Sequence, residues 1–228
     1  MNKIDFDRYV DNYNDLLRRQ TGFFSADESY FARYKVDIVR RLGTTEPQRI
    51  LEYGCGIGRN IPFLREAFAS AEVMGSDVST KSIEVARAAN PGVRFWTEGD
   101  AQGEQGEHGD FDLIFIAGVF HHVPPPERNG IAELLATRLR PGGTLVAFEH
   151  NPYNPITRKI VSECPYDKGV VLLKPRELRG LLVNAGLELL RQGYTLFFPP
   201  SLKALVRVER MLGWLPLGGQ YWISACKR

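Results

Sequence analysis

The 228-residue sequence has few cysteines, no long apolar run and no excess of either charge. Cys55, Cys164 and Cys226 lie far apart and form no Cys-x-x-Cys pair, which argues against a disulfide scaffold or a zinc ribbon. No apolar run reaches the ~18 residues of a membrane-spanning helix. The opening residues, MNKIDFDRYV, are charged and lack the apolar core of a signal peptide. We therefore expect a cytoplasmic globular protein.

The charge balance argues against nucleic acid as a partner. Lysine and arginine total 29 and aspartate and glutamate total 27, so the formal net charge is +2. A protein that neutralises a phosphate backbone usually carries a clear basic surplus. The length suits one domain, residues 1–228, and the sequence contains no internal repeat.

Short β-prone runs alternate with helical patterns in the first two thirds of the chain. The runs are residues 49–53, 71–77, 93–98, 111–119 and 144–150. Helical patterns follow the first, second and fourth runs, and Ser79 is placed to cap the second helix. This alternation predicts an α/β fold with a doubly wound, mainly parallel sheet.

The flanking segments are more varied. Residues 1–47 read as helical, with Ser25 and Glu28 forming a capping box at one helix start. Residues 151–174 contain prolines where helices could begin, so we expect a long functional loop or insertion there. Residues 175–228 then predict a helix, a strand, a second helix over 201–215 and a final strand.

A glycine-rich loop, residues 52–58, follows the first predicted strand and precedes a helix. Glycines let a backbone turn tightly and approach a ligand closely. The free N–H groups and positive dipole at a helix start suit a carboxylate or a phosphate. A dinucleotide fingerprint requires Gly-x-Gly-x-x-Gly, but its third glycine would fall on Arg59 or Ile61. The spacing therefore disfavours an NAD(P)-dependent oxidoreductase, which stays an alternative.

Two acidic residues follow the next two predicted strands. Asp77 ends the second strand, about 20 residues after the loop, where an acid can accept both ribose hydroxyls. Asp100 follows the third strand, where it can accept from an adenine amino group, and the N–H of Ala101 can donate to a ring nitrogen. Ligands of such sheets bind at the carboxyl ends of the strands, so these groups are expected to share one site.

The runs ILEYGCGIGRN, SDVS, EGDA, FDLIFIAGVFHHV and LRPGGTLV, in this order and spacing, resemble the class I S-adenosylmethionine-dependent methyltransferases. The resemblance covers about residues 48–150. It implies a Rossmann-like, seven-stranded sheet whose last strand is antiparallel, and S-adenosyl-L-methionine as cofactor. It implies that the 54–58 loop holds the methionine part, Asp77 the ribose and Asp100 the adenine. Glu52 would act on the methionine amino group through water or backbone.

The resemblance implies a fuller set of cofactor-binding residues. They are Glu52, Gly54, Cys55, Gly56, Gly58, Asn60, Asp77, Val78, Asp100, Ala101, Ala117 and Tyr13. It also implies a helical lid over residues 1–47, in which Tyr9 and Tyr13 close over the cofactor or are instead core aromatics. In residues 151–174, Arg158, Lys159 and Lys168 either meet an anionic substrate group or are solvated charges.

Histidines mark the ends of the fourth and fifth predicted strands. His121 and His122 follow the fourth, and His150 ends the fifth. An imidazole titrates near neutral pH, so His122, His150 and His121 are our candidates for a catalytic base. The alternative is that they bond the backbone or line the cofactor pocket. A His-His-Glu metal site lacks any supporting ligand spacing, so no metal is expected.

Two further patterns invite other interpretations. Asn151-Pro152-Tyr153-Asn154 resembles the Asn-Pro-Pro-Tyr signature of amino-group methyltransferases, but that signature belongs after the fourth strand, not the fifth. The helix expected over 201–215 carries a basic face that can lie on an anionic membrane. We favour a helix that packs on the sheet or roofs the substrate pocket.

The expected function is S-adenosylmethionine-dependent methyl transfer to oxygen or nitrogen of a small molecule. The acceptor classes considered are sugars, lipid-linked compounds and secondary metabolites. Besides the oxidoreductase, the alternative is a regulatory protein that binds the cofactor without catalysis, because methyl transfer requires no single indispensable residue.

Overall fold

The structure is a computed structural model that describes residues 22, 24–25, 27, 29–43, 46–99 and 109–228. Within these residues, seven strands form one sheet in the order β3-β2-β1-β4-β5-β7-β6. The strands are β1 (Arg49–Tyr53), β2 (Glu72–Asp77), β3 (Arg94–Thr97), β4 (Phe111–Ala117), β5 (Leu139–His150), β6 (Leu187–Thr195) and β7 (Gln220–Lys227). Only β7 runs antiparallel to its neighbours β5 and β6, which confirms the predicted fold class.

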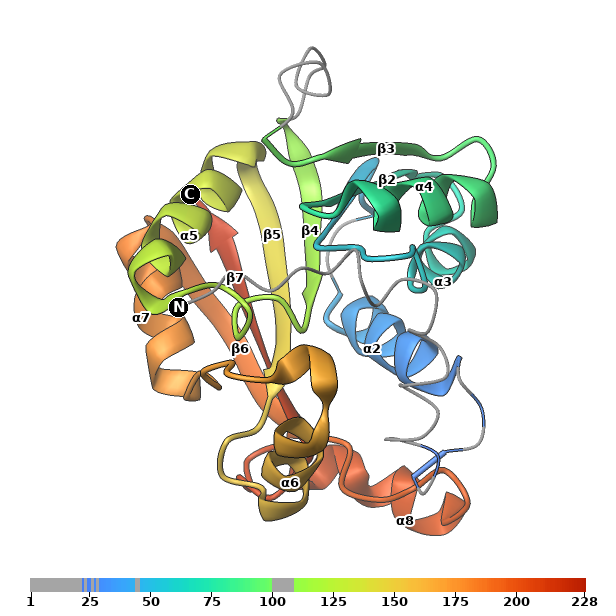
Figure 1. Cartoon of the computed structure of the whole chain (residues 1–228), viewed down its shortest axis with the longest axis vertical. Coiled ribbons are helices and arrows are strands. Elements are labelled where there is room, and N and C mark those ends of the chain that lie inside the picture. The colour runs from blue at the N-terminus through green and yellow to red at the C-terminus, as the bar shows by residue number, and fades with distance from the viewer. Residues whose placement is uncertain (1–21, 23, 26, 28, 44–45, 100–108) are drawn as a thin grey trace.

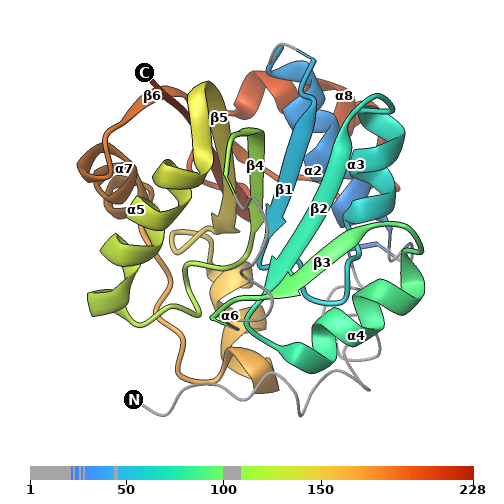
Figure 2. The same ribbon diagram turned by 90° about the horizontal axis from the view of Figure 1, so that it is seen from above.

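Helices cover both faces of the sheet (Figure 1). They are α2 (Tyr30–Arg41), α3 (Ile61–Ala67), α4 (Thr80–Ala89), α5 (Arg128–Arg138), α6 (Pro155–Glu163), α7 (Pro175–Asn184) and α8 (Lys203–Val208). Figure 2 shows α2, α3 and α4 on one side of the sheet and α5 and α7 on the other. Among the described residues, no helix combines the length and the apolar character that crossing a membrane requires.

Each central strand contributes to two apolar cores because successive side chains point to opposite faces. In β4, Leu113 and Phe115 join the cluster under α2, α3 and α4, whereas Ile114 and Ile116 join the cluster under α5 and α7. All four are fully buried. This explains why the run 111–117 reads as continuously apolar.

Several local predictions are confirmed. Ser79 caps α4, since its Oγ accepts from the N–H of Ser82 at 3.1 Å. Pro175 occupies the first turn of α7, where its missing N–H costs no helical hydrogen bond. Gly186, just after that helix, has φ +84°.

Three predictions of local structure are wrong. Of the loop or insertion expected over residues 151–174, the loop is wrong, because the segment contains α6 and a short 3-10 turn, η4 (Pro165–Asp167); the insertion stays a prediction. The helix expected over 201–215 is reduced to α8 and a 3-10 turn, η5 (Glu209–Leu212), in which Glu209 is buried. Helix α2 begins at Tyr30, several residues after Ser25. Prolines account for the first error, since proline is well suited to a first helical turn.

Candidate functional site

The loop between β1 and α3 has left-handed backbone at Gly54, Gly56 and Gly58, with φ of +69°, +52° and +78°. A Cβ atom at Gly54 would lie 2.3 Å from Cγ2 of Val119, and one at Gly58 would lie 2.7 Å from Nδ2 of Asn90. At Gly56, a Cβ would meet no described atom within 4 Å. Close packing therefore requires Gly54 and Gly58, whereas Gly56 leaves space for a ligand to approach the backbone.

Asp77, at the end of β2, fastens this loop to the sheet. The N–H of Gly56 donates to Oδ2 of Asp77 at 2.8 Å, and the N–H of Ser79 donates to Oδ1 at 2.9 Å. Burial raises the pKa of Asp77, although these N–H donors oppose that effect. Each carboxylate oxygen retains a further lone pair, so the group can still accept from a ligand hydroxyl. The ribose role assigned to Asp77 stays a prediction.

Glu52, in β1, presents a buried carboxyl group beside the glycine loop, with only 1% of the residue exposed. Asn60 donates to its Oε1 through Nδ2, but its Oε2 accepts no hydrogen bond from the described residues. Burial raises the pKa of Glu52 to about 8. A buried acceptor without a donor costs free energy. This oxygen therefore fits a cationic ligand group such as the amino group of methionine.

Lys35, on α2, adds a cation that the sequence analysis missed. Burial lowers the pKa of its amine to about 8, while the charges of Glu52 and, more weakly, Glu149 raise it. Lys35 is therefore close enough to Glu52 and Glu149 for its charge to affect both carboxyl groups. The apolar spacing that predicts α2 carries no signal for this role, because it reports only the face packed on the sheet.

The remaining predicted cofactor residues differ in accessibility. Cys55 is buried in the core under α2, and burial raises the pKa of its thiol, so only its backbone can face a ligand. Val78 is 53% exposed, and Ala117 is half-buried at the end of β4. Asp100, Ala101, Tyr9 and Tyr13 lie outside the described residues.

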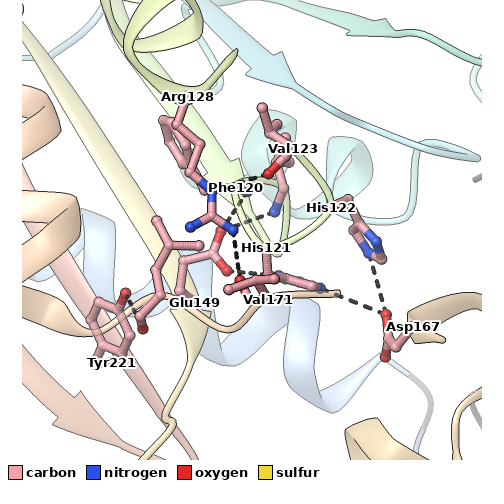
Figure 3. A network of polar contacts seen from close by, with 11 residues as sticks. Phe120, His121, His122, Val123, Arg128, Glu149, Asp167, Val171 and Tyr221 are labelled. Carbon is pink, nitrogen blue, oxygen red and sulfur yellow. Dashed lines mark hydrogen bonds and ion pairs between the residues drawn. The ribbon is translucent and has the colours of Figure 1, made fainter. Parts of the chain in front are cut away.

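The three candidate catalytic histidines do come together near Asp167 of η4: Figure 3 shows His121 and His122 facing it, and a ligand atom of His150 lies within 4.8 Å of those of His121 and Asp167. The rings of His121 and His122 are 4.1 Å apart, and those of His121 and His150 are 5.0 Å apart. Oδ1 of Asp167 lies 3.3 Å from Nε2 of His122 and 3.7 Å from Nε2 of His121. The sequence did not indicate Asp167, which lies in a different segment of the chain.

Glu149, in β5, contacts the cluster at Nδ1 of His121, whereas Asp167 lies near Nε2 of the same ring (Figure 3). Its Oε2 lies 2.7 Å from Nδ1 of His121, and its Oε1 accepts from the N–H groups of Val119 and Phe120 at 3.1 and 2.8 Å. Glu149 is 1% exposed and His121 is 3% exposed. The carboxylate thus fixes both the ring of His121 and the turn that carries it.

The buried charges shift each pKa in this cluster. Burial lowers the pKa of His121, but the nearby carboxylates of Glu149 and Asp167 outweigh it and raise the value to about 9. Burial lowers the pKa of His150 to about 4 and that of His122 well below its ordinary value, and the charge of His121 adds to both. Burial raises the pKa of Asp167, but the nearby ring of His121 outweighs burial and lowers it.

Arg128, the first residue of α5, ties the segment 165–174 to the turn after β4 (Figure 3). It is 1% exposed and donates to the carbonyl oxygen of Val123 at 3.0 Å, to that of Val171 at 2.7 Å and to Glu177 at 2.5 Å. Tyr221 donates to the carbonyl oxygen of Leu173 at 3.1 Å. These bonds keep Asp167 near the histidines.

The Asn-Pro-Tyr-Asn run has a structural role. Nδ2 of Asn151 donates to the carbonyl oxygens of Pro216 and Gly218 at 3.0 and 2.7 Å. Oδ1 of Asn154 caps α6 by accepting from the N–H of Thr157 at 3.0 Å. Both side-chain amides form hydrogen bonds within the protein. Asn151 thereby connects this run to the loop before β7, and Asn154 caps α6.

A pocket of about 700 Å³ opens between α6 and the segment that follows it. Asp167 lines this pocket as well as contacting the histidines. Three basic residues line it too, namely Arg158, Lys159 and Lys168. Asp167 is therefore the residue that this basic pocket and the histidine cluster share.

Comparisons with known proteins place these features in context. The family model described as "Methyltransferase domain" matches residues 50–143. The trans-aconitate 2-methyltransferase of Methylobacterium nodulans is 30% identical over 145 residues, which cover 62% of this chain and 54% of that protein. The demethylmenaquinone methyltransferase of Thermus thermophilus is 34% identical over 142 residues, which cover 60% of this chain and 61% of that protein. The chain thus spans less than two thirds of either relative.

Solved structures share the fold over nearly the whole chain. A methyltransferase of Thermotoga maritima, described as a possible histamine N-methyltransferase, has a TM-score of 0.67 at 20% identity and covers 98% of both chains. The magnesium protoporphyrin IX methyltransferase of Synechocystis PCC 6803, solved with its cofactor bound, has a TM-score of 0.60 at 21% identity with the same coverage. These likenesses establish a common fold.

Proposed function

Because the chain belongs to the class I S-adenosylmethionine-dependent methyltransferases, we propose that it transfers a methyl group from this cofactor to oxygen or nitrogen of a small molecule. The observation that carries the proposal is the buried Oε2 of Glu52, which lacks a donor among the described residues and lies beside the glycine loop. The histidine cluster adjoins the same loop, since Val119 contacts Gly54 two residues before His121.

Different residues are proposed to bind different parts of the cofactor. Glu52 is proposed to bind the amino group of its methionine part and Asp77 its ribose, with the backbone of Gly56 open to the ligand. When bound, the cofactor supplies an activated methyl group and a good leaving group. The main contribution of the protein is alignment, which can lower the barrier by ~7–11 kcal/mol.

The acceptor is proposed to bind against the three histidines. Glu149 holds His121 in place, and His122 and His150 remain the candidates for contact with the acceptor atom. A proton acceptor is required only when the attacking atom carries a proton of high pKa. The step itself is a displacement at carbon, so water exclusion and orientation matter more than acid–base strength.

The pocket between α6 and residues 167–172 is the proposed entry for the acceptor. Its basic residues, Arg158, Lys159 and Lys168, favour an acceptor with an anionic group. One relative is named for trans-aconitate, which is such an anion. Sugars, lipid-linked compounds and secondary metabolites that carry carboxylate or phosphate remain the classes to test.

Calorimetric titration with S-adenosylmethionine, S-adenosylhomocysteine and NADH tests cofactor choice. We expect heat with the first two and none with NADH; the opposite result would favour the oxidoreductase alternative. A screen for S-adenosylhomocysteine release should compare anionic metabolites with their uncharged esters. Cofactor binding without any turnover across the screen would instead favour a regulatory protein.

A matched pair of variants tests the acceptor pocket. Replacing Arg158, Lys159 and Lys168 with glutamine should raise KM for an anionic acceptor at least tenfold, without changing cofactor affinity. Arg176, Arg179 and Arg191, which are exposed and lie outside the pocket, provide the control substitutions with the same loss of charge. An equal change in both variants would show that only the net charge matters.

A further inference from the structure

Three potential metal ligands converge at the histidine cluster. His121 comes from the turn after β4, His150 from the end of β5, and Asp167 from η4. One ligand atom from each lies within 4.8 Å of the others. The sequence predicts no metal, because Glu149 is the third ligand that the local residue order suggests and no ligand spacing supports that set.

The distance between His121 and Asp167 suits a shared ion better than a direct bond. Nε2 of His121 and Oδ1 of Asp167 are 3.7 Å apart. This is too long for an N–H···O hydrogen bond, which rarely exceeds about 3.2 Å. Two ligands of one tetrahedral ion with bonds of about 2.0–2.2 Å lie about 3.4 Å apart. A small inward movement would place both atoms on one cation.

Glu149 supplies an independent indication. Its Oε2 lies 2.7 Å from Nδ1 of His121, so in the neutral ring Nδ1 would carry the proton and Nε2, which faces Asp167, would carry the lone pair (Figure 3). Metal-bound histidines nearly always donate their other N–H to a carboxylate, carbonyl or water. The other oxygen of Glu149 is held by two backbone N–H groups, so this supporting contact is itself fixed.

Charge balance agrees with a cation. Glu149 and Asp167 are 1% and 6% exposed, and buried carboxylates require a paired positive charge or a metal. Lys35 interacts with Glu149, but more strongly with Glu52. A protonated His121 would balance one of the two carboxylates, whereas a divalent ion with two neutral imidazoles would balance both.

We propose that His121, His150 and Asp167 bind a divalent transition-metal ion, with Glu149 orienting His121. Two imidazoles and one carboxylate suit zinc or iron better than magnesium, which prefers oxygen ligands. Three protein ligands leave a coordination position for water or an acceptor atom. The ion's relevance to the acceptor rests on the proposed function, whereas the ligand geometry does not.

Cobalt(II) and zinc(II) are the probes, used with full-length protein that lacks a polyhistidine tag. We expect one ion per chain, with a visible cobalt spectrum of tetrahedral nitrogen and oxygen ligation and no thiolate charge-transfer band. Asp167→Asn should weaken zinc binding at least tenfold, whereas Glu163→Gln, on an exposed side chain of α6, should not. The Cys226→Ser background removes the half-buried thiol as a competing ligand.

Circular dichroism and S-adenosylmethionine titration accompany each variant. If Asp167→Asn unfolds the chain, the cobalt spectrum of the Glu163→Gln and Cys226→Ser proteins still decides the question. Absence of a bound ion in a protein that binds S-adenosylmethionine would overturn the metal site alone. Equal zinc affinity in folded Asp167→Asn and Glu163→Gln would overturn the ligand assignment. Loss of cofactor binding in the unmodified protein would instead contradict the proposed function.

Discussion

The N–H of Gly56 donates to Oδ2 of Asp77 at 2.8 Å, joining the glycine loop directly to the end of β2. The carboxylate therefore shapes the loop even before a ligand arrives. Because its other oxygen binds the N–H of Ser79, Asp77 also fixes the start of α4. A residue assigned to cofactor binding by pattern alone thus also organises the two backbone segments around it.

Asp77→Ala should weaken S-adenosylmethionine binding at least tenfold, about 1.4 kcal/mol. The substitution removes the proposed ribose acceptor and releases the loop. Calorimetry with S-adenosylmethionine and S-adenosylhomocysteine measures the change. Glu84→Ala, which removes an exposed acid from α4, is the control for charge. Unchanged affinity in Asp77→Ala would refute the ribose assignment.

Glu52 should make the ligand-free protein less stable as pH rises. Its folded pKa, raised to about 8, exceeds the ordinary value of 4.5, so the folded state holds the proton longer. Its contribution is complete below pH 4.5 and is lost as pH rises toward 8, with a slope of up to ~1.4 kcal/mol per pH unit. Urea unfolding between pH 5 and 8 should show a smaller decline in Glu52→Gln. Parallel declines in the two proteins would contradict the buried, protonated state.

Cofactor affinity should follow the opposite trend at the same residue. An amino group bound at Glu52 favours the carboxylate form, so S-adenosylmethionine should bind more tightly as pH rises toward the pKa of about 8. Titrations at several pH values compare the unmodified protein with Glu52→Gln, in which this gain should disappear. An affinity that does not change with pH in the unmodified protein would argue against Glu52 as the ammonium site.

Gly54→Ala should destabilise the chain by about 1–3 kcal/mol, as expected for overpacking, because its Cβ would lie 2.3 Å from Val119. The double variant Gly54→Ala with Val119→Ala should recover part of this loss, leaving the cost of a left-handed alanine, ~1–2 kcal/mol. Gly56→Ala should lose only the free energy that a left-handed alanine costs, since its Cβ would lie within 4 Å of no described atom. Thermal and urea unfolding would rank the three variants. Failure of Val119→Ala to rescue would exclude the predicted clash.

Arg128→Met should cost about 2–6 kcal/mol, because each buried acceptor left without its donor costs about 1–3 kcal/mol; it also removes the ion pair with Glu177. The acceptors that lose their donor are the carbonyl oxygens of Val123 and Val171. Glu177→Gln should cost under about 1 kcal/mol, because that side chain is 42% exposed and screened by water. Urea unfolding measures both. Similar losses in the two variants would mean that the ion pair, rather than the carbonyl contacts, dominates.

The periodic elements of this fold could be predicted from the sequence, but the long-range contacts of the site could not. Strand β4 and the cap at Ser79 follow from local patterns of apolar and hydroxyl residues. Asp167 meets the histidines only because Arg128 and Tyr221 hold the segment 165–174 against the body of the protein. Lys35 reaches Glu52 through the packing of α2 on the sheet. Such contacts depend on tertiary structure, which no local spacing encodes.

Residues 151–174 are fastened at both ends, by Asn151 to the loop before β7 and by Leu173 to Tyr221 of that strand. In evolutionary terms the segment is replaceable, because a different sequence between the same two attachment points would leave the sheet intact. A replacement segment without an acid at the position of Asp167 would remove the carboxylate that lies next to His121 and His122. Because the same segment lines the pocket proposed for the acceptor, a change in acceptor choice and a change in the chemistry of the histidine cluster would then evolve together.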